Sequence, residues 1–174
     1  MTSEVRPSAE AGTVTFDPHN CFACGSLNTN GLQLDLHFQA DRCWTELAIP
    51  ERFQGWDEIA HGGIVSTILD EVMAWSLVDR DNWGLTARLN VQFRRPVPLG
   101  RRIRAEGRVT NTRRRLIDTA ATIVDAGTGD LLATADGTYV AAPDDRKREL
   151  KARYGFRRVP AAVAGPAATA GPTR

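Results

Sequence analysis

Residues 61–71 have the sequence HGGIVSTILDE, and this stretch decides the fold. From there, apolar residues recur at the spacing of an α-helix and cover more than half of its circumference: Ile64, Val65, Ile68, Leu69, Val72, Met73 and Leu77. A helix with so wide an apolar surface has to be covered by other elements on most sides. The stretch therefore predicts one long, buried helix that begins directly after His61.

Strand patterns lie on both sides of this helix. Before it, residues 32–38 alternate between apolar and polar side chains, and residues 42–49 follow as a hairpin partner. After it come four further strand-like runs, at 87–94, 102–109, 116–124 and 131–140, and residues 144–154 suit a short charged helix. This order predicts an α+β fold in which an antiparallel sheet wraps around one helix.

The composition fits one domain of ordinary size. The chain has 174 residues, of which 42% are hydrophobic, and we expect the domain to span residues 17–155 between disordered segments at 1–16 and 156–174. The formal net charge is +1, so no overall field favours nucleic acid or an anionic membrane. With no secretory signal pattern and no apolar run long enough to span a bilayer, we expect a cytoplasmic protein.

Asp70 carries a charge in the middle of this apolar helix, where burial alone would favour an uncharged side chain. An unpaired carboxylate in a protein core is strongly unfavourable, so its charge must face either a second protein surface or a ligand cavity. Glu71, one step around the helix, is the competing candidate. Asp70 is therefore a candidate catalytic carboxylate, although a structural hydrogen bond across a dimer interface would also explain it.

Gly62 and Gly63 occupy the first turn, where backbone N–H groups have no partners within the helix and the helix dipole favours negative charge. Without a Cβ atom, glycine lets a substrate carbonyl approach closely, and His61 can cap the turn. A carboxylate and an oxyanion donor suffice to cleave a thioester, whose thiolate leaves with little protonic help. No Gly-x-Ser-x-Gly serine nucleophile motif is present.

These residues resemble the helix of hotdog-fold acyl-CoA thioesterases of the phenylacetate-pathway (PaaI-like) type, in which HGG is followed by an acid nine positions after the histidine. The similarity continues at residues 86–96, TARLNVQFRRP, and at residues 21–25, CFACG, with Asn28 and Gly31 after them. It covers roughly residues 20–142.

The resemblance implies a six-stranded hotdog sheet around the helix, homodimers that often pair into tetramers, and hydrolysis of acyl-CoA without an organic cofactor. By position, Asp70 is the nucleophile or general base, the Gly62 N–H is the oxyanion donor, His61 supports the first turn and Thr86 orients the attacking water. The family often has an asparagine shortly before HGG. This chain departs from that pattern, so Gln54 takes the asparagine's place in our assignment.

Three residues are candidates for substrate binding. Gly63 belongs to the first turn beside the oxyanion donor, and Arg94 and Arg95 suit the phosphates of coenzyme A. Solvated strand ends explain the two arginines about as well. For the whole chain, the alternative function is non-catalytic binding or sensing of an acyl thioester; a hotdog dehydratase is disfavoured because no second histidine lies near a helix start.

The three cysteines are an odd count and argue against a disulfide framework. Cys21 and Cys24 have the spacing of a zinc knuckle, and His19, His37 or Cys43 are available as further ligands. The usual second Cys-x-x-Cys or histidine pair is missing. From the sequence we therefore expect no metal, and we interpret the two cysteines as small buried residues of a turn.

Overall fold

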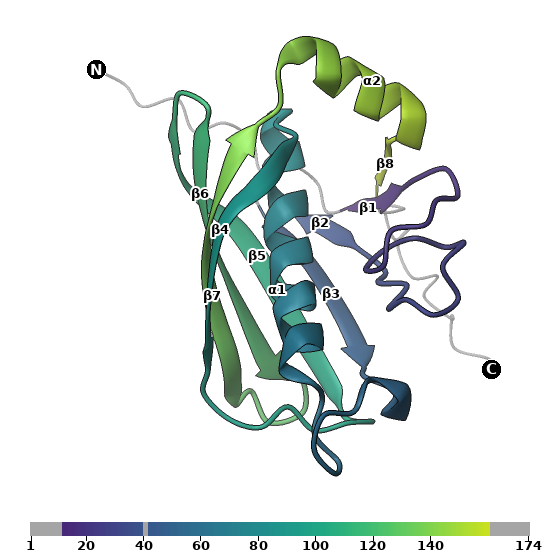
Figure 1. Ribbon diagram of the computed structural model, residues 1–174, viewed down its shortest axis with the longest axis vertical. Coiled ribbons are helices and arrows are strands. Elements are labelled where there is room, and N and C mark those ends of the chain that lie inside the picture. Colours follow the sequence, from purple (N-terminus) through teal and green to yellow (C-terminus); the bar gives the residue numbers. More distant parts are fainter. Residues whose placement is uncertain (1–11, 40–41, 161–174) are drawn as a thin grey trace, which may run out of the picture.

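A computed structural model describes residues 12–39 and 42–160 as a curved antiparallel sheet with a long helix lying across its concave face (Figure 1). Its strands follow the order β4-β7-β6-β5-β3-β2-β1-β8. Their bounds are β1 Gly12–Thr15, β2 His37–Gln39, β3 Arg42–Ala48, β4 Gly84–Phe93, β5 Arg102–Arg113, β6 Leu116–Asp125, β7 Leu131–Ala141 and β8 Arg157–Pro160. The helices are α1 Gly62–Ser76 and α2 Asp144–Tyr154, with short 3-10 turns at Glu51–Phe53 and Leu77–Arg80.

Strands β2 to β7 and helix α1 form the predicted α+β hotdog fold, a six-stranded antiparallel sheet around a central helix. The core lies between α1 and the sheet, where Ile68, Leu69, Val72 and Met73 are completely buried. Gly107 on β5 lets the helix come this close, because a Cβ atom there would lie 2.5 Å from the backbone of Val72. The prediction of one long buried helix is confirmed.

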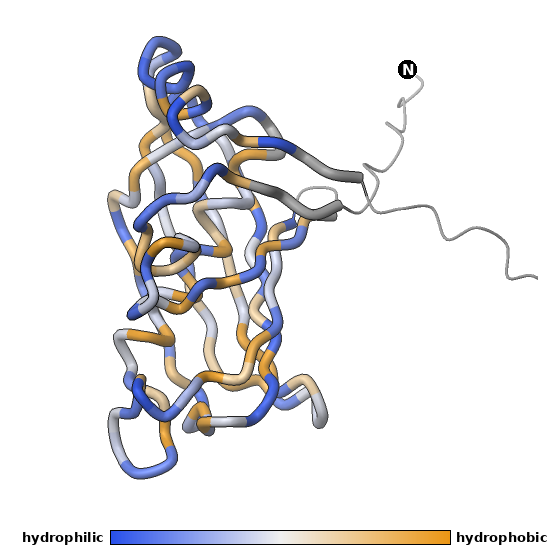
Figure 2. Tube along the Cα trace, turned by 90° about the vertical axis from the view of Figure 1, so that its right-hand side faces the viewer, coloured by the Kyte–Doolittle hydropathy of each residue, from blue (hydrophilic) through white to orange (hydrophobic). Residues whose placement is uncertain are grey.

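The strands turn one face toward α1 and the other toward solvent. Every second residue is buried along β6 and along β5 as far as Val109, and Figure 2 shows hydrophobic and hydrophilic residues alternating along the strands. The inward residues pack on α1, while the outward face of β3 and β5 carries ion pairs such as Arg104 with Glu46 and with Glu106. A sheet with one apolar face needs a cover on that face alone, and α1 provides it.

The predicted strand at residues 32–38 is mostly wrong, since β2 begins only at His37. Gln33 has a φ of 50°, which breaks an extended strand. The backbone N–H groups of Leu32 and Leu34 donate to the carbonyls of Phe22 and Ala23 instead of pairing with β3. The alternation was still meaningful, because Leu34 and Leu36 are buried.

Two short strands extend the sheet beyond the predicted domain limits of 17–155. Strand β1 pairs with β2 on one side and with β8 on the other, so residues 12–15 and 157–160 are part of the sheet. The remainder of the segments predicted to be disordered, residues 1–11 and 161–174, lies outside the described residues. Within the described part of the chain, no helix is both long and apolar enough to cross a membrane.

Candidate active site

The first turn of α1 has one capped and one free backbone donor. His61 has extended backbone angles, φ −61° and ψ 134°, and its Nδ1 accepts the Gly63 N–H at 2.9 Å. The Gly62 N–H donates no hydrogen bond to any described residue. Of the two glycines, Gly62 therefore has the donor that remains available to an oxyanion.

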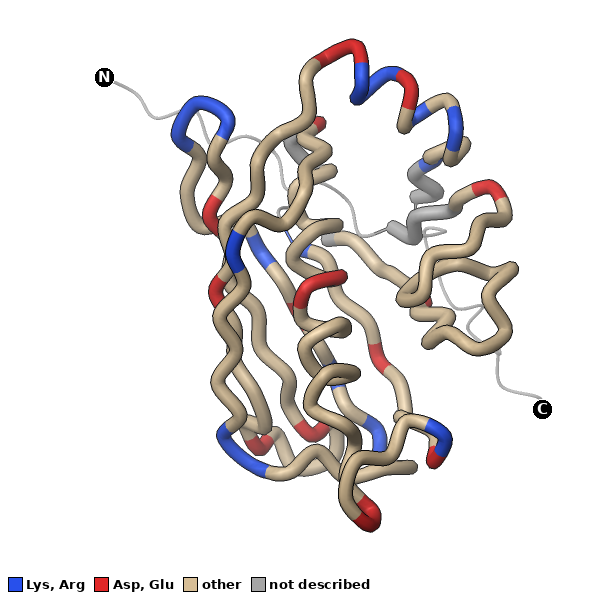
Figure 3. Tube along the Cα trace, in the orientation of Figure 1, with Lys and Arg blue, Asp and Glu red and all other residues tan. Residues whose placement is uncertain are grey.

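Asp70 is held by two hydroxyl groups. Asp70 and Glu71 are the charged residues of α1, and they mark the acidic segment halfway along the helix (Figure 3). The Thr86 hydroxyl donates to Oδ1 of Asp70 at 2.9 Å, and the Tyr139 hydroxyl donates to the same oxygen at 2.7 Å. Oδ2 accepts no hydrogen bond from the described residues, so this half-buried carboxylate has one anchored and one free oxygen.

The two donors come from neighbouring strands. Thr86 on β4 and Tyr139 on β7 are direct cross-strand partners, and the register shifts immediately afterwards, between Thr86 and Arg88. Opposite residues of an antiparallel pair leave the sheet on the same face, which brings both hydroxyls to Asp70. Thr86 was a sequence candidate for orienting water; here its hydroxyl contacts the carboxylate itself.

Tyr139 is a site residue that the sequence did not single out. Its side chain is fully buried, and burial, followed by the nearby Asp70 carboxylate, raises the pKa of the phenol well above its ordinary value. It therefore stays protonated as a hydrogen-bond donor at neutral pH. A buried tyrosine needs a partner for its hydroxyl, so a tyrosine at an inward position of a predicted strand was the available signal.

Glu71 points to a different neighbourhood. Its Oε1 accepts the indole N–H of Trp75 at 2.8 Å, and its carboxylate lies beside the thiols of Cys21 and Cys24. Burial, followed by Cys21, raises the pKa of Glu71 to about 7. The two adjacent acids of α1 thus have different partners: Glu71 faces Trp75 and the two cysteines, and Asp70 contacts the hydroxyls of Thr86 on β4 and Tyr139 on β7.

The structure does not bring the other three candidates to Asp70. The Gln54 side chain accepts the backbone N–H of Glu58 at 3.3 Å, which braces the loop before the helix. Arg94 and Arg95 follow the end of β4 and are exposed, with Arg94 bonded to Gln92 and Arg95 paired with Asp130.

Strand β4 connects the two ends of the candidate site. It lies at the edge of the sheet, paired only with β7 among the described strands. Thr86 near its start contacts Asp70. The Phe93 ring at its end lies against Gly62, because a Cβ atom added to Gly62 would be 3.4 Å from Cζ of Phe93. Gly62 and Asp70 therefore lie near opposite ends of one exposed strand.

Comparisons with known proteins agree with this fold. Residues 58–131 match the family model of the thioesterase superfamily, whereas the curated proteins gave no match. Among solved structures, one thioesterase superfamily protein has 24% identity and a TM-score of 0.66, with 70% of this chain and 60% of that chain covered. This chain thus spans less than two thirds of that protein.

Two further solved structures have lower sequence identity. A hypothetical thioesterase from Streptococcus pneumoniae, solved with coenzyme A, has 15% identity and a TM-score of 0.56, covering 58% of this chain and 81% of that one. The PaaI protein of the Escherichia coli phenylacetic acid degradation operon has 15% identity and a TM-score of 0.60, covering 64% and 81%. At these identities the likeness concerns the fold. The chain is therefore similar to the thioesterase superfamily in sequence over residues 58–131, and it shares the hotdog fold with these solved structures.

Proposed function

We propose that this protein hydrolyses an acyl-CoA thioester to the free acid and coenzyme A, with Asp70 as nucleophile or general base. The observation that carries the proposal is the carboxylate of Asp70, which has Oδ1 anchored by Thr86 and Tyr139 and Oδ2 free. Two hydroxyl donors hold Oδ1 and fix the direction of the carboxylate. A carboxylate held in this way is prepared for attack on a carbonyl carbon or on a water.

In the first route, Oδ2 bonds to the thioester carbonyl carbon, the C–S bond breaks, and coenzyme A leaves as a thiolate. Water then cleaves the resulting anhydride and regenerates the carboxylate. In the second route, Oδ2 takes a proton from water while the water oxygen attacks the carbonyl carbon, and the thiolate leaves in the same way. Both routes place negative charge on the carbonyl oxygen, for which the free Gly62 N–H is the donor.

We infer that the complete site requires two copies of the chain. Gly62 and Asp70 are eight residues apart on α1, or about 12 Å along the helix axis, which is too far for one carbonyl to contact both. If β4 pairs antiparallel with the β4 of a second copy, the Phe93 end of one strand approaches the Thr86 end of the other. Gly62 of one copy then lies near Asp70 of its partner, twice in a two-fold dimer.

The exposed edge supports this pairing. The ten-residue strand β4 exposes Leu85 and Phe93, which are 80% and 55% accessible, and long uncovered edge strands readily pair with another chain. The same pairing brings Arg94 and Arg95 close to the shared sites, where their guanidinium groups suit the phosphates of coenzyme A. The solved Streptococcus pneumoniae relative with coenzyme A supports this class of substrate.

The test is Asp70→Asn assayed with a panel of acyl-CoA thioesters and detection of the released thiol. We expect turnover to fall at least about a hundredfold, about 3 kcal/mol in the barrier, because the amide is neither nucleophile nor base. Asp118→Asn is the matched control, since Asp118 also accepts a threonine hydroxyl, from Thr138, but lies on β6 away from α1.

If wild-type protein binds the thioesters and releases no thiol from any of them, the chain is a non-catalytic acyl-thioester binding protein. If folded Asp70→Asn turns over at the wild-type rate, Asp70 is not the catalytic carboxylate. Either result contradicts the proposal.

A further inference from the structure

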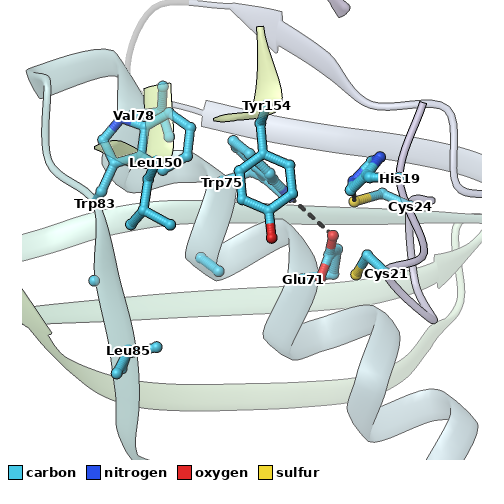
Figure 4. A pocket seen from close by; sticks show the side chains of 12 residues that line it. His19, Cys21, Cys24, Glu71, Trp75, Val78, Trp83, Leu85, Leu150 and Tyr154 are labelled. Carbon is cyan, nitrogen blue, oxygen red and sulfur yellow. Dashed lines mark hydrogen bonds between the residues drawn. The ribbon is translucent and has the colours of Figure 1, made fainter. Parts of the chain in front are cut away.

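A second group of chemically active side chains surrounds Glu71, the residue next to Asp70 on α1. The Sγ atoms of Cys21 and Cys24 and a carboxylate oxygen of Glu71 all lie within 4.8 Å of one another. Nε2 of His19 lies 3.5 Å from Sγ of Cys24. Figure 4 shows these four side chains at one end of a cavity of about 240 Å³, whose other end is formed by aromatic and aliphatic side chains.

The backbone of the N-terminal turn segment, residues 16–36, fixes three of the four. The Gly25 N–H donates to the Cys21 carbonyl at 3.0 Å, and the Leu27 N–H donates to the His19 carbonyl at 3.1 Å. A Cβ atom on Gly25 would lie 2.4 Å from the Cys21 nitrogen and 2.5 Å from the His19 oxygen, so only glycine fits. The tight turn holds both thiols and the imidazole on the side that faces Glu71.

Among the described residues, no lysine or arginine compensates the acidic members of this group. Glu71 forms no ion pair with a lysine or arginine of the described chain, and its one hydrogen bond from a nitrogen comes from the Trp75 indole. Nδ1 of His19 is buried and has no hydrogen-bond partner within the described residues. A largely desolvated carboxylate next to two thiols is costly in its ionised form unless a proton or a cation joins them.

We propose that His19, Cys21, Cys24 and Glu71 bind one zinc ion, which ties the N-terminal turn segment to the central helix. Two sulfurs, one nitrogen and one oxygen are a donor set that zinc accepts in tetrahedral geometry. In such a site neighbouring donor atoms are about 3.5 Å apart, which is the distance from His19 Nε2 to Cys24 Sγ. His19 does not lie within 4.8 Å of all three other ligands, so its ring has to turn toward them when the ion binds. Four protein ligands leave no open position, so the ion is structural.

In the sequence a second ligand pair beside Cys21 and Cys24 is missing, which disfavours a metal. The fold brings Glu71 of α1 to both thiols and places His19, two residues before the first cysteine, beside Cys24. The other sequence candidates lie elsewhere: the His37 ring stacks on Trp44 at 4.2 Å between centroids, and Cys43 is buried in β3. The site is independent of the proposed hydrolysis, although it fixes the helix turn next to Asp70.

The test is metal analysis of the full-length protein, purified with a reducing agent from cells supplied with zinc. We expect about one zinc per chain, and replacement by cobalt should give the intense thiolate-to-cobalt absorption of a sulfur-ligated tetrahedral site. The Cys21→Ser and Glu71→Gln variants should lose at least about nine tenths of the zinc, whereas Cys43→Ala should retain it. Chelation should lower the melting temperature of wild type but not of Glu71→Gln.

Three results would overturn the proposal. One is wild-type protein without zinc that has three titratable thiols, even after dialysis against equimolar zinc. Another is a disulfide between Cys21 and Cys24 in place of the metal. The third is zinc that remains at wild-type levels in both the folded Cys21→Ser and the folded Glu71→Gln variants, since the ion would then lie elsewhere.

Discussion

The Tyr139 hydroxyl lies 2.7 Å from Oδ1 of Asp70 and 3.0 Å from the backbone carbonyl oxygen of the same residue. A fully buried tyrosine of β7 thus holds the one acid of α1 that faces the sheet edge. The contact links the sheet to the middle of the helix and leaves the second oxygen of the carboxylate without a donor from the described residues. It is the relationship on which the positioning of the candidate nucleophile depends.

Tyr139→Phe should therefore lower thioester turnover about tenfold while the fold persists. The ring stays in the core, but Asp70 loses one of its two donors, and a hydrogen bond to a charged group contributes about 1.5–3 kcal/mol. Steady-state kinetics on the best thioester and a thermal melt check this. Tyr154→Phe makes the same chemical change at the only other tyrosine and should leave turnover unchanged. Equal losses in both variants would show that Tyr139 has no special part in the site.

Thr86→Val should also reduce turnover, since valine keeps the shape of threonine and removes the hydroxyl donor to Oδ1. Thr86→Ser, which keeps the hydroxyl, should restore most of the rate. In the double variant with Tyr139→Phe, Oδ1 has no donor left from the described residues. We expect the two losses to be non-additive, as for two groups that act on one atom, and a double-mutant cycle measures the coupling. Strictly additive losses would mean that the hydroxyls act separately.

The sequence predicts the helix and most of the strands, because apolar periodicity shows which face of each element is buried. The spacing of Gly62 and Asp70 can be read from it directly. The role of Tyr139 could not be predicted, since it depends on the cross-strand register of β4 and β7. Nor could the meeting of Glu71 with Cys21 and Cys24, which joins segments that are far apart in the chain. The phenylacetate-type branch remains a prediction, because distant structural likeness reports the fold and not the substrate.

The carboxylate of Asp125 should make the stability of the fold depend on pH. Its Oδ1 accepts the N–H groups of Gly127 and Thr128 at 2.9 and 3.0 Å, and Arg101 pairs with Oδ2. These contacts, the Thr128 N–H first, hold the pKa of Asp125 below its ordinary value. A lowered pKa in the folded state means that the unfolded chain binds the proton first. The stabilisation is therefore complete above about pH 4 and disappears as the pH falls through the folded-state pKa.

Asp125→Ala should accordingly melt at a lower temperature than wild type at pH 6, and the difference should shrink steadily below pH 4. Melting curves of both proteins across that range provide the measurement. Asp144→Ala, at the exposed start of α2, serves as the control with a small and nearly constant difference. A difference for Asp125→Ala that is the same at pH 3 as at pH 6 would mean that the turn needs the side chain but not its charge.

The shared site is testable because proline can remove the Gly62 donor without breaking the helix. Position 62 is the first residue of α1, where proline is tolerated, and His61 before it already has the extended backbone that a following proline requires. Gly62→Pro thus deletes the proposed oxyanion donor, and Asp70→Asn deletes the carboxylate. If each site combines Gly62 of one chain with Asp70 of its partner, either homodimer is defective at both of its sites.

A mixed dimer of the two variants behaves differently, since one of its sites contains both defects and the other contains neither. Unfolding and refolding equal amounts of Gly62→Pro and Asp70→Asn together makes about half of the dimers mixed, so activity should recover to about a quarter of wild type. Two different affinity tags allow the mixed dimers to be isolated, and these should reach about half of the wild-type rate. Refolding each variant alone controls for partial activity. Isolated mixed dimers that remain inactive would show that Gly62 and Asp70 do not act across the interface, so that either the donor is another N–H or both groups serve one chain.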